Sequence, residues 1–83
     1  MNTEKVLINR LVGTLLRANS PEKMLNRLET LLTSSELETI ATRLEILRLL
    51  KQGLTQREIA KQLGVGIATV TRGARELKQG NLE

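Results

Sequence analysis

Three residues near the end of this 83-residue sequence constrain its fold most strongly: Ala60, Gly64 and Val70. Two helices that cross at a steep angle need a small side chain where they nearly touch, and Ala60 is small. Four residues later, the turn between them needs a residue that tolerates a left-handed backbone, which Gly64 does, and Val70 closes the small core. This spacing predicts a helix-turn-helix from about Thr55 to Lys78.

The rest of the chain is predicted to be helical as well. Phe, Tyr and Trp are absent, so the core must be built from aliphatic side chains. Apolar residues recur at helical spacing and predict an all-α fold of about five helices, at 3–18, 21–32, 33–52, 55–64 and 67–78. Expected boundary signals are the N-cap Ser20 with Pro21, the capping boxes Thr33-Glu36 and Thr55-Glu58, and the stops Gly53 and Gly64.

We expect one domain over residues 1–83, with core and dimerisation helices in 1–52 and the helix-turn-helix in 55–78. A single chain of this length can bury only a small core, which favours a partner chain. The inner face of the helix-turn-helix is predicted to comprise Ile59, Ala60, Leu63, Ile67, Val70, Ala74 and Leu77.

Composition excludes several classes of function. The sequence has no Cys and no His, which rules out disulfides, thiol nucleophiles and the usual zinc sites. No grouping of nucleophile, base, paired acids or phosphate loop is present, so we expect neither an enzyme nor a metal site. No apolar run is long enough to cross a bilayer and the start does not resemble a signal peptide, so a cytoplasmic location without membrane contact is expected.

Basic charge is concentrated in the predicted helix-turn-helix. The chain carries a net charge of +4, and residues 56–78 hold five basic residues against two acidic ones. The side chains expected to face outward are of the types that contact phosphates or base edges: Gln56, Arg57, Lys61, Ala68, Thr69, Thr71, Arg72, Arg75 and Lys78. The pattern favours binding to double-stranded DNA, and a helical hairpin used only for packing or protein contacts is the alternative.

The stretch from Leu63 to Gly73, preceded by Thr55-Gln56-Arg57-Glu58 and by Thr42-Arg43, closely resembles the Trp repressor family. The likeness is strong over about residues 33–78 and only topological over the first two helices. It implies an intertwined homodimer that binds L-tryptophan as corepressor and then binds an operator controlling tryptophan biosynthesis or uptake.

The resemblance also implies roles for individual residues. The operator-facing positions are Gln56, Arg57, Ile67, Ala68, Thr69, Thr71 and Lys78. The ligand-facing positions are Arg43, Arg72, Gly73 and Thr33, with Leu32 and Thr30 at the edge of the pocket. In the family, the arginine equivalent to Arg72 pairs with the ligand carboxylate, and the one equivalent to Arg43 lies along the indole.

Two of these positions are unusual without the resemblance. Arg43 lies in an apolar stripe of its helix, and Gly73 in mid-helix costs about 1 kcal/mol relative to Ala. A planar ring against the helix backbone would explain both residues. The alternatives are an arginine whose stem lies on apolar surface and a glycine required for close helix packing.

The sequence also departs from the family pattern. Glu76 stands where the family commonly has a small hydroxyl residue near the ligand ammonium group, so it could bind that group or neutralise Arg72. Ala60, beside Lys61, replaces a position that can carry a basic operator contact, and the printed sequence stops at Glu83, before the family's last helix. Two other hypotheses remain: a ligand-independent DNA-binding protein of replication-initiator or transposase type, and a dimeric protein-interaction module.

Overall fold

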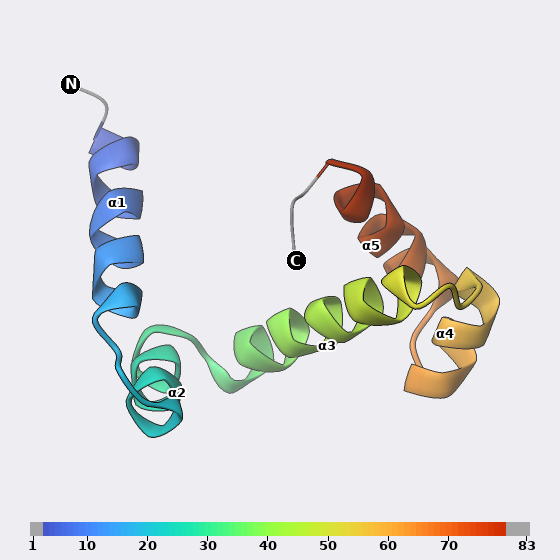
Figure 1. Cartoon of the computed structure of the whole chain (residues 1–83), viewed down its shortest axis with the longest axis horizontal. Helices are drawn as coiled ribbons and strands as arrows, with labels where there is room; N and C mark the ends of the chain where they lie inside the picture. The colour runs from blue at the N-terminus through green and yellow to red at the C-terminus, as the bar shows by residue number, and fades with distance from the viewer. Residues whose placement is uncertain (1–2, 80–83) are drawn as a thin grey trace. The chain divides into compact units, whose positions relative to one another are not determined.

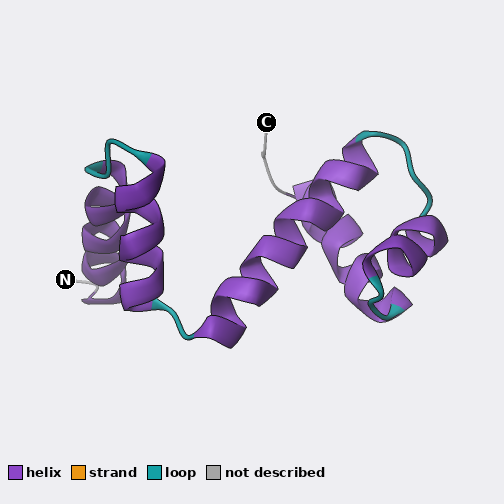
Figure 2. Ribbon diagram, turned by 90° about the horizontal axis from the view of Figure 1, so that it is seen from below, coloured by secondary structure: helices purple, strands orange, loops and turns teal. Residues whose placement is uncertain are grey.

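The computed structural model describes the backbone of residues 3–79 and the side chains of residues 3–75. Within this range the chain forms five helices and no strand (Figure 1), which confirms the all-α prediction. The helices are α1 (Thr3–Leu16), α2 (Pro21–Leu31), α3 (Ser34–Lys51), α4 (Gln56–Leu63) and α5 (Ile67–Gln79). Short loops join them (Figure 2), and the predicted helix limits agree with the observed ones to within two residues.

The chain divides into two compact units at the boundary between Leu37 and Glu38. The first unit contains α1 and α2. Ser20 caps α2, since its side chain accepts a hydrogen bond from the Lys23 N–H, and Pro21 occupies the first helical turn. The guanidinium of Arg27 donates to the carbonyl of Thr14 in the last turn of α1. Because the last carbonyls of a helix have no helical donor, Arg27 satisfies a group that α1 cannot satisfy itself.

The second unit contains most of α3 together with α4 and α5. Its core consists of the buried residues Ile46, Leu49, Ile59, Ala60 and Val70, with Leu50, Leu54, Leu63 and Val65 packed around them. Three of the inner-face predictions, Ile59, Ala60 and Val70, are confirmed by this burial. The small core holds α4 and α5 against the C-terminal half of α3 (Figure 1).

One of the inner-face predictions is wrong. Ile67 is 54% exposed, whereas Val70 and Gly73, three and six residues further along α5, are buried. Ile67 is the first residue of its helix, so it lies at the end of the buried face and beyond the core that Val70 closes. Leu77 was also predicted to face inward, and its side chain lies outside the described residues.

The start of α3 carries a complete capping box. The Thr33 N–H donates to Oε1 of Glu36 (2.8 Å), and the Glu36 N–H donates to Oγ1 of Thr33 (3.1 Å). The hydrogen bond from the Thr33 N–H, followed by a side-chain hydrogen bond of Thr33 with the same carboxylate, lowers the pKa of the Glu36 carboxyl below its usual value. The carboxylate is therefore the form that caps the helix.

This cap gives the stability of α3 a defined pH dependence. A lowered folded-state pKa means that the cap stabilises the helix fully above the usual glutamate pKa and that this contribution is lost as the pH falls through the lowered value. We expect an NMR pH titration to show the Thr33 amide proton moving with the Glu36 carboxyl, at a pKa below that of a free glutamate. Glu36→Gln, which keeps an acceptor oxygen but cannot ionise, should remove this transition. Titration of Glu36 at the ordinary value would contradict the cap.

Candidate nucleic-acid interface

Helix α4 is delimited by signals in its own sequence. Thr55 adopts an extended backbone and its Oγ1 accepts from the Glu58 N–H (3.1 Å), which satisfies one of the free donors at the helix start. At the other end, Gly64 has φ 67° and ψ 34°, a left-handed conformation, and its N–H donates to the Ala60 carbonyl. A left-handed residue costs little only when it is glycine. The predicted turn at Gly64 is therefore confirmed.

The next helix, α5, approaches α3 very closely at Gly73. Gly73 is buried, and a Cβ placed on it would lie 2.5 Å from Cγ2 of Ile46 and 3.5 Å from its Cβ. No side chain fits at the first of these distances. The alternative that Gly73 serves close helix packing therefore accounts for the glycine, and contact of this residue with a ligand remains a proposal.

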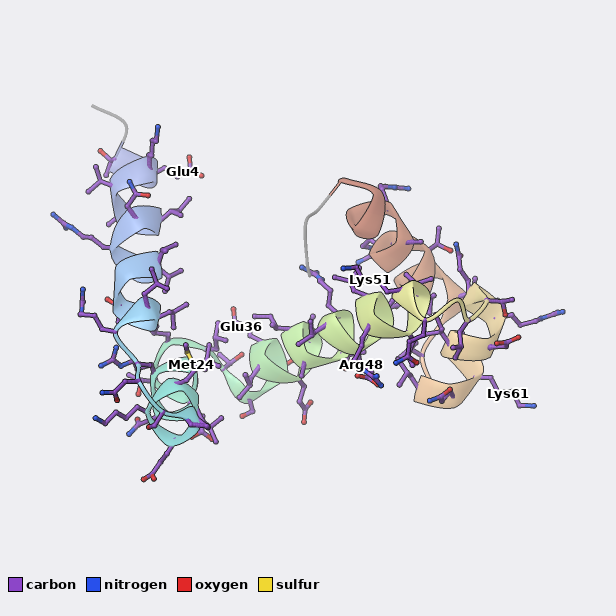
Figure 3. All side chains as sticks on the ribbon, in the orientation of Figure 1. Glu4, Met24, Glu36, Arg48, Lys51 and Lys61 are labelled. Carbon is purple, nitrogen blue, oxygen red and sulfur yellow. The ribbon has the colours of Figure 1, made fainter. Side chains whose placement is uncertain are left out.

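Around this core, the outer surface of α4 and α5 is exposed and polar. Of the residues predicted to contact DNA, the exposed ones are Arg57, Lys61, Ile67, Ala68, Thr69, Thr71 and Arg72, and Arg75 is exposed beside them. Gln56 is half-buried. Lys61 extends from α4 into solvent (Figure 3). Lys78 was also predicted to contact DNA, and its side chain lies outside the described residues.

The charge of this surface is strongly asymmetric. From Gln56 to Arg75, α4 and α5 carry four basic residues, Arg57, Lys61, Arg72 and Arg75, against the single acid Glu58. Exposed arginine and lysine side chains attract the phosphates of nucleic acid from a distance and contact them without regard to sequence. The surface is thus suited electrostatically to a polyanion.

One contact within this surface was missed from the sequence. Thr71 donates a hydrogen bond from Oγ1 to Oε1 of Gln56, at 2.8 Å, which joins α5 to the first residue of α4. Both residues had been predicted to contact DNA as separate groups. They are 15 positions apart, so no helical periodicity pairs them, and only the crossing of α4 and α5 brings them together.

The candidate ligand residues come from both units. Arg43 on α3 and Arg72 on α5 are exposed, and Gly73 is buried against α3. Leu32 is the C-cap of α2, and Thr33 forms the capping box of α3, so both belong to the first unit. The Glu76 side chain lies outside the described residues.

A further charged pair lies on α3. Nε and Nη2 of Arg48 donate to the two carboxylate oxygens of Glu45, at 2.8 and 2.6 Å. This interaction lowers the pKa of the Glu45 carboxyl and raises that of the Arg48 guanidinium. Because the charge of Arg48 is balanced by its neighbour, this pair adds no net charge to the surface of α3.

Two kinds of feature are absent from the part of the chain that the structure describes. Among residues 3–79, no helix has the length and apolar character needed to cross a membrane. Among the side chains of residues 3–75, no three acidic groups gather into a cluster that could hold a metal ion. The fold and the surface together define a helical protein of the helix-turn-helix class.

Comparison with known proteins identifies the family within that class. The family described as "Trp repressor protein" matches residues 7–83. The chain belongs to the Trp repressor family, which is a family of DNA-binding regulators and not of enzymes. This confirms the family indicated by the sequence resemblance.

Several curated relatives carry the name "Trp operon repressor homolog". One from Vibrio vulnificus is 54% identical over 52 residues, which cover 61% of this chain and 51% of the relative. One from Vibrio campbellii is 51% identical over 61 residues, which cover 72% of this chain and 59% of the relative. One from Xylella fastidiosa is 39% identical over 74 residues, which cover 88% of this chain and 80% of the relative. The aligned part spans about half the length of the first of these, 51%. No solved structure matches the chain.

Proposed function

We propose that this chain is a sequence-specific transcriptional repressor that binds double-stranded operator DNA as a homodimer, with L-tryptophan as corepressor. Its target genes would be those of tryptophan biosynthesis or uptake. The observation that carries the proposal is the exposed surface of α4 and α5, with four basic groups against one acid, held on a buried core. Membership of the Trp repressor family supports the same function.

Each part of this surface has a role in the proposal. Exposed Arg57 and Lys61 on α4 supply charge for backbone phosphates, which position a protein on the duplex. Residues 67–69 begin α5 and are exposed, and the first turn of a recognition helix is where base edges are contacted. We assign operator reading to this turn, within the proposed DNA-binding segment 55–78.

The first helices support a homodimer. Helix α1 has no buried residue, and five of its large apolar side chains are at least 43% exposed: Leu7, Ile8, Leu11, Val12 and Leu16. Apolar surface of this extent on one helix favours burial against another chain. We propose that residues 1–52 provide dimer contacts, so sedimentation equilibrium should give twice the chain mass of 9.3 kDa. A monomer mass at micromolar concentration would contradict the dimer.

The corepressor site is proposed to lie between α3 and α5. Arg72 would pair with the ligand carboxylate, and the exposed guanidinium of Arg43 would lie along the indole ring. The family resemblance also implies contacts at Gly73, Leu32 and Thr33, with Thr30 at the edge of the pocket. Glu76 is proposed to hold the ligand ammonium group, in place of the hydroxyl residue common in the family.

A fluorescence titration tests the function. The chain has no Trp, Tyr or Phe, so the emission of added tryptophan reports binding without a protein background. We expect binding to be saturable and to tighten when duplex DNA selected by the protein from a random-sequence pool is present, because coupling between two ligands is reciprocal. DNA binding itself should weaken steeply between about 50 and 200 mM salt, since several phosphates are neutralised.

Two arginines on the same helix provide the matched comparison. Arg72→Ala should abolish the fluorescence response without DNA, whereas Arg75→Ala, at another exposed position of α5, should retain it. A flat titration at millimolar tryptophan contradicts the corepressor and leaves the ligand-independent DNA-binding protein. Failure to bind any duplex at low salt contradicts DNA binding and favours the protein-interaction module.

A further inference from the structure

The hydrogen bond between Thr71 and Gln56 limits what each residue can offer to DNA. A threonine hydroxyl has one proton, and that of Thr71 is donated to Oε1 of Gln56 at 2.8 Å. Phosphate oxygens only accept hydrogen bonds. While this bond is present, Thr71 has no donor left for a phosphate, although its exposed position suggests a direct contact.

The same bond orients the amide of Gln56. A glutamine amide has an acceptor oxygen at one end and two N–H donors on Nε2. Because Oε1 is turned toward Thr71, the Nε2 donors lie at the other end of the amide. Gln56 is only half-buried and is the first residue of α4, so its side chain borders the basic surface. A hydrogen bond from a second helix also restricts the rotamers of this long side chain, which lowers the entropy lost on binding.

We infer that Thr71 is a positioning residue that acts through Gln56, and that Gln56 presents its Nε2 hydrogens to a hydrogen-bond acceptor on DNA. This inference rests on the DNA-binding function proposed above. It assigns the two residues to a single contact, in place of the two independent contacts expected from the sequence. Thr71 therefore contributes to affinity only when Gln56 is present.

A double-mutant cycle tests the inference. Thr71→Val removes the hydroxyl and keeps the β-branched shape, and Gln56→Ala removes the amide. Binding of the wild type, both single variants and the double variant is measured on the selected duplex and on a shuffled duplex. We expect each single variant to bind about fivefold more weakly, as for one lost hydrogen bond, and the double variant to bind no more weakly than Gln56→Ala. Thr71→Ser, which retains the hydroxyl, should bind like the wild type.

A measurement without DNA tests the positioning role separately. In the 15N–1H spectrum, Thr71→Val should shift the side-chain amide signals of Gln56 and leave those of Gln62, an exposed glutamine on the same helix, unchanged. Gln62→Ala is the matched control for Gln56→Ala and should not alter DNA binding. Equal weakening on both duplexes would assign the acceptor to the phosphate backbone, and weakening on the selected duplex alone to a base edge.

Several outcomes overturn the inference. They are additive effects of Thr71→Val and Gln56→Ala, wild-type affinity in Thr71→Val, and unchanged Gln56 signals in that variant. The proposed function fails in a different way, because the wild type itself would then bind neither duplex. If the wild type binds DNA and the effects of Thr71→Val and Gln56→Ala on affinity are additive, only the coupling of Thr71 to Gln56 is refuted.

Discussion

Replacement of Gly73 by alanine is expected to lower the free energy of unfolding by about 2 kcal/mol and to weaken DNA binding with it. The new Cβ would lie 2.5 Å from Cγ2 of Ile46, which is too short for two carbon atoms that are not bonded to each other. Ile46 is 1% exposed and β-branched, so its methyl group cannot rotate away and α5 must move from α3. Movement of α5 also changes the crossing of the helix-turn-helix that presents the basic surface.

Two opposing effects decide the sign of this change. Alanine is favoured over glycine in a helix by about 1 kcal/mol, which would stabilise α5. Overpacking of a core costs about 1–3 kcal/mol and occasionally more, and a contact this short between two stiff groups belongs at the upper end. The steric cost therefore exceeds the gain in helix propensity.

Gly13→Ala is the matched control. Gly13 also lies inside a helix, but an added Cβ there meets only the end of the Arg17 side chain, at 3.5 Å. This variant should be neutral or more stable, as helix propensity alone predicts. Ile46→Leu removes the offending Cγ2 and should partly rescue Gly73→Ala in urea unfolding at one protein concentration. If Gly73→Ala were as stable as the wild type, the close approach of α3 and α5 would be refuted.

Replacement of Ile59 by alanine is expected to destabilise the second unit by about 3 kcal/mol, the larger of the two effects. Ile59 is 0% exposed and belongs to the core that joins α3, α4 and α5. Its truncation removes three carbon atoms from this core and leaves a cavity that the surrounding packed helices can close only in part. The loss is a large fraction of the stability of a small domain, so the thermal transition should become shallow or disappear.

Ile67→Ala provides the comparison within the same motif. Ile67 is 54% exposed, so its truncation should change stability little, although it removes the same atoms. Under the proposed function it should instead lower operator affinity, because it begins the helix assigned to base contacts. Circular dichroism and DNA binding should therefore separate the two variants. Equal loss of stability in both would contradict the observed burial.

The positions of the helices were predictable from local sequence. Ser20, Thr33 and Thr55 cap helix starts with side-chain oxygens only three residues from the N–H groups that they accept from. Gly64 ends α4 through its own backbone conformation. These signals act within one helical turn, so they operate before any tertiary contact exists. The burial of Ala60 and Val70 was likewise predictable, from their positions four residues before and six residues after Gly64.

The details of the candidate site depended on how helices distant in sequence cross. The contact of Gly73 with Ile46, the bond from Thr71 to Gln56 and the outward position of Ile67 each depend on an angle or distance between helices. Periodicity gives the face of a helix on which a residue lies, but not which partner meets it or where that face ends. Arg43 illustrates this limit, because the sequence places it in an apolar stripe of its helix, whereas in the structure it is exposed to solvent.

By itself the sequence determined the five helices, the turn at Gly64, the basic surface and the family, because each depends on residue types at short, fixed spacing. The tertiary structure alone decided that Gly73 is needed for packing and that Thr71 and Gln56 form one unit. Both results follow from the close crossing of α5 with α3 and α4. Side chains compete for space and for hydrogen-bond donors only after the helices have packed, so these roles are absent from any local pattern.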